Sequence, residues 1–141
     1  MIIMPTADET NSEDELPDDA IVIRGGLMSR KDLIASVRKC FALKGVYGLT
    51  VWSFAGLTAQ DIALQVKNLH VEGLNPLGHG QLRQSTARTI REPGSGGRTL
   101  VLKKTGREGH YTLTFQSEPT DADWDRLENM FGLPEPNPAA D

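Results

Sequence analysis

Cysteine is almost absent from this chain of 141 residues, which contains only Cys40. A single thiol excludes an intramolecular disulfide and a structural zinc site built from several thiolates. The sequence also lacks a run of about 18 apolar residues that would span a bilayer. Its first residues have neither the basic stretch nor the long apolar stretch of a secretion signal. We therefore expect a cytoplasmic protein with no membrane partner.

Sequence motifs for nucleotide and metal sites are missing as well. Neither the GxxxxGK phosphate loop nor the GxGxxG dinucleotide fingerprint occurs. The three histidines, His70, His79 and His110, have no cysteine or carboxylate at zinc-ligand spacing. We expect no bound metal and no obligatory cofactor.

Acidic and basic residues are separated along the chain, although the formal net charge is only -4. Residues 1–19 hold seven acids and no base, whereas residues 20–110 hold fourteen bases against five acids, a balance of +9. Residues 111–141 hold seven acids and one base. A basic central segment between acidic ends predicts a domain that attracts phosphates or acidic chains.

The length and the composition predict one globular domain over residues 19–133. Residues 1–18 combine high charge with few apolar side chains, so we expect a disordered acidic arm there. Residues 134–141 are expected to form a Pro-rich tail.

The hydrophobic pattern predicts helices and strands within this domain. β-branched and aromatic runs indicate strands at 20–23, 46–54, 98–104 and 110–116, with a further short strand at 69–71. Helical spacing behind Ser29, Thr58, Ser85 and Thr120 as caps indicates helices over 30–44, 59–68, 86–90 and 121–131. We expect an α/β or α+β fold, with three or four helices on a small mixed sheet of about four to five strands.

A basic segment in the second half of the domain is the main candidate for a binding surface. Lysine and arginine on strands and loops attract phosphates and give salt-dependent affinity for nucleic acid, RNA above all. The same residues also suit a solvated strand edge that resists pairing with other chains. The segment consists of Arg83, Arg88, Arg91, Arg98, Lys103, Lys104 and Arg107.

His110 and Arg24 are the candidates for reacting or positioning groups. His110 begins a strand next to the basic segment, where it would serve a ribonuclease as general acid or base. The alternative is a hydrogen-bonded surface histidine. Arg24 ends the first strand before Gly25-Gly26, where it could hold a phosphate bidentately or lie solvated in a tight turn.

Arg24, Ser85-Thr86 and Gln116-Ser117-Glu118 occur in an order that resembles ADP-ribosyltransferases of the Arg/Ser-Thr-Ser/Gln-x-Glu type. The resemblance implies NAD as cosubstrate, with Arg24 on its phosphate, Ser85 supporting the pocket and Glu118 orienting the ribose. This chain has Ala87 where the family has a second serine. The segment after Gln116 equally suits a strand end that leads into a capped helix.

A second resemblance covers most of residues 20–138. Val22-Ile23-Arg24-Gly25-Gly26-Leu27, Tyr47-Gly48-Leu49-Thr50-Val51 and His110-Tyr111-Thr112 are similar to segments of a group of small uncharacterised bacterial proteins with an Arg-Gly-Gly first strand. That group implies no activity. Toxins of toxin–antitoxin pairs are comparable in size and charge, which is an analogy of size and not of site.

Three functional hypotheses follow from the sequence. The first is a small bacterial toxin-like or accessory domain that binds a phosphate-rich partner, RNA in particular, with ribonuclease activity as its sharpest form. The second is an NAD-dependent ADP-ribosyltransferase. The third is a non-catalytic module that binds an acidic partner chain. The sequence predicts no oligomeric state.

Overall fold

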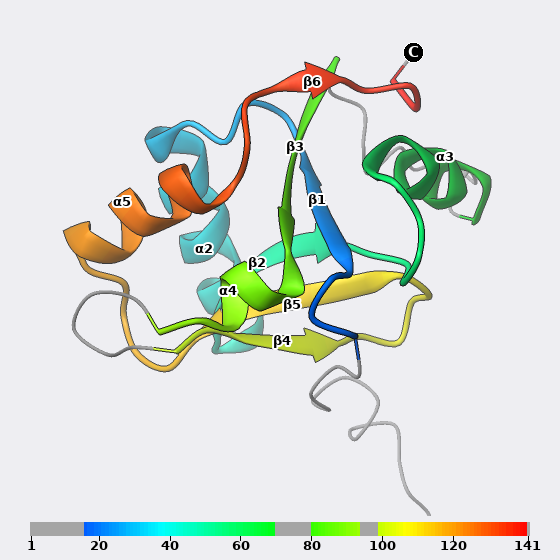
Figure 1. Ribbon diagram of the computed structural model, residues 1–141. Coiled ribbons are helices and arrows are strands. Elements are labelled where there is room, and N and C mark those ends of the chain that lie inside the picture. The colour runs from blue at the N-terminus through cyan, green and yellow to red at the C-terminus, as the bar shows by residue number, and fades with distance from the viewer. Residues whose placement is uncertain (1–15, 70–79, 94–98, 141) are drawn as a thin grey trace, which may run out of the picture.

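The computed structural model describes residues 16–69, 80–93 and 99–140. The predictions made for residues 1–15 of the acidic arm and for His70, Val71, His79 and Arg98 lie outside these described residues. The elements in chain order are β1 (Ile21–Gly25), α2 (Arg30–Lys44), β2 (Tyr47–Trp52), α3 (Ala59–Leu69), β3 (Gln81–Thr86), α4 (Ala87–Arg91), β4 (Val101–Lys104), β5 (His110–Phe115), α5 (Asp121–Met130) and β6 (Glu135–Pro136) (Figure 1).

The strands of the described part form one six-stranded sheet in the order β4-β5-β2-β1-β3-β6. Every neighbouring pair is antiparallel, including β1 and β2 on either side of α2. The α+β class is thereby confirmed, with more strands than the expected four or five and antiparallel pairing in place of a mixed sheet. Hydrophobic periodicity identifies a strand but carries no information on its direction.

β3 was not predicted as a strand, and it includes the residue that the sequence predicted as a helix cap. Ser85 belongs to this strand, and Thr86 is the N-cap of α4, with its hydroxyl accepting from the Thr89 N–H at 3.1 Å. The prediction of Ser85 as the cap was therefore wrong by one residue. The strand sequence Gln-Leu-Arg-Gln-Ser-Thr lacks an apolar alternation, and two of its polar side chains, Arg83 and Gln84, bond to other parts of the domain.

The expected Pro-rich tail contributes to the fold through β6. Glu135 pairs with Leu82 of β3, and its carboxylate accepts hydrogen bonds from the amides of Gln60 and Gln84. Ala139 is fully buried in the core. The sequence did not predict this strand, because a pairing of two residues, one of them a proline, is too short to give a periodic signal.

α2 shows why some boundaries were predicted correctly. Ser29 caps its first turn by accepting from the Asp32 N–H, and Gly45 ends it in the left-handed conformation with φ 75. The Gly45 N–H donates to the Phe41 carbonyl at 2.8 Å. Glycine is the residue that adopts this conformation without steric cost, so the stop signal is local.

Two hydrophobic clusters hold the helices on the sheet. The larger contains Val22, Leu49 and Leu113 of the sheet together with residues from α2, α4 and α5. The smaller joins Ile23 and Leu82 to α3. α3 accordingly lies on the opposite side of β1 and β3 from α2 and α5 (Figure 1).

The described residues before β1 pack against the domain. Leu16 is 8% exposed and belongs to the larger cluster, and the Ala20 N–H donates to the Pro17 carbonyl.

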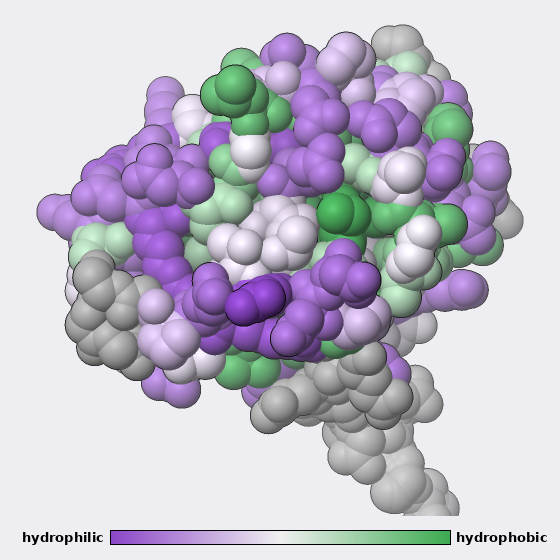
Figure 2. Space-filling model, viewed as in Figure 1, coloured by the Kyte–Doolittle hydropathy of each residue, from purple (hydrophilic) through white to green (hydrophobic). Residues whose placement is uncertain are grey.

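Hydrophilic residues form a band over α4 and β4 on the face that Figure 2 shows. Within the described ranges, no helix has the length and apolar character needed to cross a membrane.

Candidate nucleic-acid interface

Arg83, the first residue of the predicted basic segment, is bonded to the end of α5. Its guanidinium donates to the carbonyls of Glu128 and Phe131 at 2.7 Å each and of Gly132 at 2.6 Å. α5 has no basic residue in its last turn, and these carbonyls have no partner within the helix. Arg83 supplies the missing donors and a positive charge at the negative end of the helix dipole.

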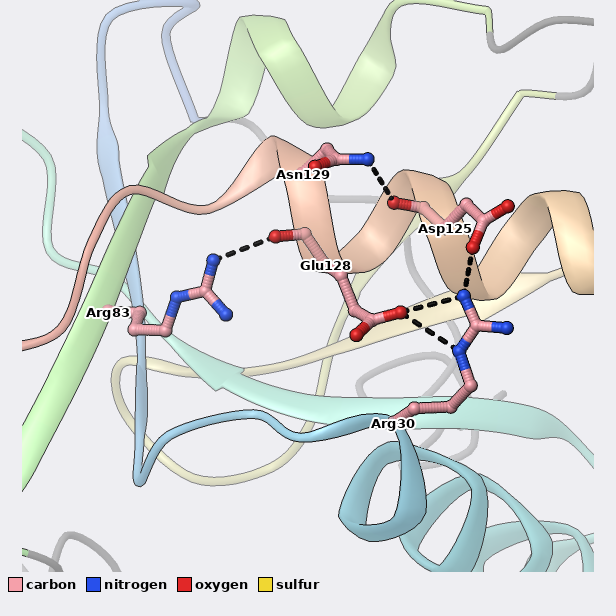
Figure 3. A network of polar contacts seen from close by, with 5 residues as sticks. All are labelled: Arg30, Arg83, Asp125, Glu128 and Asn129. Carbon is pink, nitrogen blue, oxygen red and sulfur yellow. Dashed lines mark hydrogen bonds and ion pairs between the residues drawn. The ribbon is translucent and has the colours of Figure 1, made fainter.

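Glu128 links this cap to a second arginine (Figure 3). The Arg30 Nε donates to the Glu128 carboxylate at 2.9 Å, and the same guanidinium also contacts Asp125. These two hydrogen bonds raise the pKa of Arg30. Ion pairs of Arg30 with Asp125 and Glu128 therefore join α2 to α5.

Arg91 and Arg88 also have partners within the domain. The Arg91 guanidinium donates to the Asp18 carboxylate at 3.0 Å and to the Leu16 carbonyl at 2.7 Å. The Arg88 Nε lies 3.8 Å from the Glu92 Oε2. This exposed pair, one helical turn apart, contributes little to stability. Arg91 thus fastens the start of the described chain to α4.

Arg126 is a further internal arginine that sequence reasoning missed. It donates to the carbonyls of Ile90 and Glu92 at the end of α4. Burial lowers its pKa, opposed by the charges of Asp123 and Glu92. Nothing in its local sequence distinguishes it from a solvated helix residue, because its acceptors come from a distant segment.

Arg24 is half-buried where β1 and β2 separate. Its guanidinium donates to the Thr50 carbonyl at 2.7 Å and to the Ser36 hydroxyl of α2 at 3.0 Å. Burial lowers its pKa, and the charge of Asp32 acts in the opposite direction. The side chain borders a hollow of about 720 Å³ that Gly25 and Gly26 also line.

The three residues of the ADP-ribosyltransferase pattern are not joined to one another. Ser85 is buried on β3, and its hydroxyl has no hydrogen-bond partner in the described structure. Glu118 is exposed in the loop after β5. No hydrogen bond or ion pair within the described ranges connects Arg24, Ser85 and Glu118, so the transferase role of these residues stays a prediction.

His110 is held under the loop that joins β4 to β5. The residue is 8% exposed, and its Nδ1 is 2.6 Å from the Thr105 hydroxyl. The imidazole also packs edge-on against the Trp52 ring, with centroids 4.6 Å apart. A general base must reach a substrate proton, and this ring is enclosed on two sides.

Lys103, Lys104 and Arg107 are the predicted bases for which the described structure gives no carboxylate or carbonyl partner. Lys103 pairs with Thr112 of β5, and Lys104 pairs with Tyr111. Tyr111 packs against the larger core cluster. Because successive side chains of a strand alternate, Lys103 and Thr112 lie on the opposite face of the sheet.

That opposite face carries a row of polar side chains across three strands. Thr50 of β2 pairs with Thr112 of β5, which pairs in turn with Lys103 of β4. Thr114, two residues beyond Thr112, lies on the same face. Thr50 is exposed and the others are half-buried. We name Thr50, Lys103, Thr112 and Thr114 the threonine face.

Arg107 borders the threonine face at one end. Trp52 lies two residues beyond Thr50 and so on the same face. The Arg107 guanidinium carbon is 5.6 Å from the centroid of the Trp52 ring, which is a cation–π contact. The exposed guanidinium is thereby held over the sheet while its N–H groups stay accessible.

α2 borders the same face at its other end. A Cβ placed on Gly48 would lie 2.4 Å from Thr112 Cγ2 and 3.2 Å from Cys40 Sγ, so α2 and β5 meet over this glycine. Lys39 is exposed next to Cys40 on the helix surface. β2, β4 and β5 contain no acidic residue. Lys103 therefore lies on a neutral polar strip that Arg107 borders.

No family model, curated protein or solved structure matches the chain. No group of three or more potential metal ligands occurs in the part of the chain that the structure describes.

Proposed function

We propose that the protein binds the phosphate backbone of RNA across the threonine face. The row formed by Thr50, Thr112 and Lys103 is the observation that carries the proposal. Phosphate oxygens in protein complexes accept hydrogen bonds mainly from Arg, Lys, Ser and Thr. The row offers two hydroxyl groups and an ammonium group side by side.

The charge around the row supports the same conclusion. Arg107 lies at one end, the exposed Lys39 precedes the Cys40 that meets the other end at Gly48, and no acid occurs on the three strands. Gly48 and Trp52 are four residues apart on β2, about 13 Å at the usual rise of a strand. A polyanion that crosses the strip meets Arg107 at one end and Lys103 at the level of Thr50 and Thr112.

This interface is smaller than the basic segment predicted from the sequence. Arg83 and Arg91 are engaged with the C-terminal end of α5 and with Leu16 and Asp18. From that segment the proposal keeps Lys103 and Arg107, and it adds Lys39. It is a proposal of binding. Ribonuclease action through His110 stays a prediction from the sequence.

Binding of single-stranded RNA across a salt series tests the proposal. The double variant Lys103→Gln/Arg107→Gln removes two phosphate contacts. The negative slope of log K against log salt should become shallower by about 1.4, since each contact contributes about 0.7 to its magnitude. Arg88→Gln is the matched control, because it removes one exposed cation away from the threonine face. An equal loss per charge in the control would show that net charge alone decides binding.

An acidic protein partner predicts a different result in the same assay. Poly-glutamate of equal charge would then bind more tightly than RNA, and Thr112→Val would leave both affinities unchanged. Tighter RNA binding that weakens in Thr112→Val supports the proposed function. Absence of RNA binding by the unaltered protein at low salt would refute it.

A further inference from the structure

The hollow beside Arg24 lies between the end of β1 and the first two turns of α2. It has a volume of about 720 Å³, and its walls include Gly25, Gly26, Gly80 and Ser36. Three of these four residues have no side chain, so a ligand can approach the backbone closely. The size suits a small molecule.

Arg24 presents unused donors to this hollow. A guanidinium has five N–H donors, and two of those on Arg24 are taken by the Thr50 carbonyl and the Ser36 hydroxyl. The remaining three have no acceptor among the described residues. The two hydrogen bonds to Thr50 and Ser36 fix the orientation of the Arg24 guanidinium. An anion in the hollow would therefore meet a preorganised cation.

Asp32 places a negative charge at the same hollow. It is the third residue of α2, its backbone N–H donates to the Ser29 hydroxyl, and the exposed residue lines the hollow. The charge of the carboxylate acts to raise the pKa of Arg24, against the larger effect of burial. The two groups nevertheless form no ion pair in the described structure. The hollow thus keeps a cation and an anion apart.

We propose that the hollow binds a small zwitterion, whose phosphate or carboxylate accepts from Arg24 and whose ammonium group donates to Asp32. A simple anion gains only the first contact and is repelled by Asp32. A simple amine gains only the second and is repelled by Arg24. A molecule that carries both groups gains both contacts and relieves both repulsions.

The test uses phosphoethanolamine, with inorganic phosphate and ethanolamine as its two halves and β-alanine as the carboxylate counterpart. Titration calorimetry gives the affinities, and the amide NMR shifts of Gly25, Gly26 and Gly80 locate the site. We expect phosphoethanolamine or β-alanine to bind at least tenfold more tightly than either half, with shifts at those glycines. Whichever of phosphoethanolamine and β-alanine binds more tightly shows whether the site prefers a phosphate or a carboxylate.

Asp32→Asn tests the ammonium contact without touching the half-buried arginine. It should weaken zwitterion binding about tenfold and leave inorganic phosphate unchanged or tighter. Asp61→Asn is the matched control, because Asp61 is the third residue of α3 and its N–H is capped by Thr58 in the same way. Equal effects of the two variants, no preference for the zwitterions, or no shifts at the glycines would each overturn the proposal.

Discussion

Arg24 and Arg83 are register partners on β1 and β3, yet their guanidinium groups bond to different elements. Arg24 donates to Ser36 of α2, and Arg83 donates to the carbonyls that end α5. Like charges at directly paired positions repel one another. Their separate acceptors keep them apart and connect two helices to adjacent strands.

Arg83→Met should lower the free energy of unfolding by about 2–3 kcal/mol, because the hydrogen bonds of a charged group are lost and α5 loses its cap. Urea unfolding followed by circular dichroism measures the change. Arg88→Met removes an exposed arginine with one weak partner and should stay within about 0.5 kcal/mol of the unaltered protein. Equal free energies of unfolding for the two variants would show that the contacts of Arg83 with the end of α5 do not stabilise the fold.

Ser85→Ala should leave stability unchanged or raise it by up to about 1 kcal/mol, because the buried hydroxyl has no partner to lose. Ser53→Ala is the matched comparison. Ser53 is also buried, but its hydroxyl donates to the Ile21 carbonyl at 2.5 Å, so its removal should cost about 1 kcal/mol. Thermal unfolding of both variants decides the matter, and a destabilised Ser85→Ala would reveal a partner for that hydroxyl.

Gly109→Ala should lower the free energy of unfolding by at least about 2 kcal/mol. Gly109 has φ +77, and an added Cβ would lie 2.2 Å from the Phe54 ring. Gly106 lies in the same loop, and its Cβ would meet no atom within 4 Å. Gly106→Ala should therefore unfold at nearly the unaltered urea midpoint. Equal midpoints for the two variants would mean that the loop shifts easily.

Removal of residues 1–15 should strengthen RNA binding at low salt, because it deletes five acids (Asp8, Glu9, Glu13, Asp14 and Glu15). The advantage should shrink as salt screens the charges. Removal of residues 1–18 also deletes Leu16 and Asp18, the partners of Arg91, and should lower the urea midpoint. RNA affinity that is unchanged in the shorter deletion at 20 to 50 mM salt, roughly the range where screening is weak, would exclude a competing role for these acids.

The elements predicted correctly are those whose signals are local. α2 combines a serine cap, helical spacing and a terminal glycine, and β5 shows alternation of Tyr111, Leu113 and Phe115. β3 and β6 were missed because they show no apolar alternation, and Arg83, Gln84 and Glu135 bond to partners that are distant in the sequence. Glu135 illustrates this, since it accepts from Gln60 and Gln84.

The site was predicted only in part, for the same reason. A base on a strand or helix looks alike in sequence whether it meets solvent or a distant carbonyl, and Arg83 differs from Lys103 only in the folded domain. One signal was available: in His-Tyr-Thr-Leu-Thr-Phe, Thr112 and Thr114 alternate with apolar residues that pack in the core. That alternation already indicates a hydroxyl-bearing outer face.

Most of the cations that bond to other elements in the described part of the domain are arginines. The guanidinium groups of Arg24, Arg30, Arg83, Arg91 and Arg126 bond to other elements, whereas in the described residues the ammonium groups of Lys31, Lys39, Lys44, Lys103 and Lys104 have no such partner. Acetylation neutralises lysine and leaves arginine charged. Acetylation of the lysines would therefore change the electrostatic surface of the protein while its internal arginine contacts persist, so that surface charge and folding stability respond to separate chemistry.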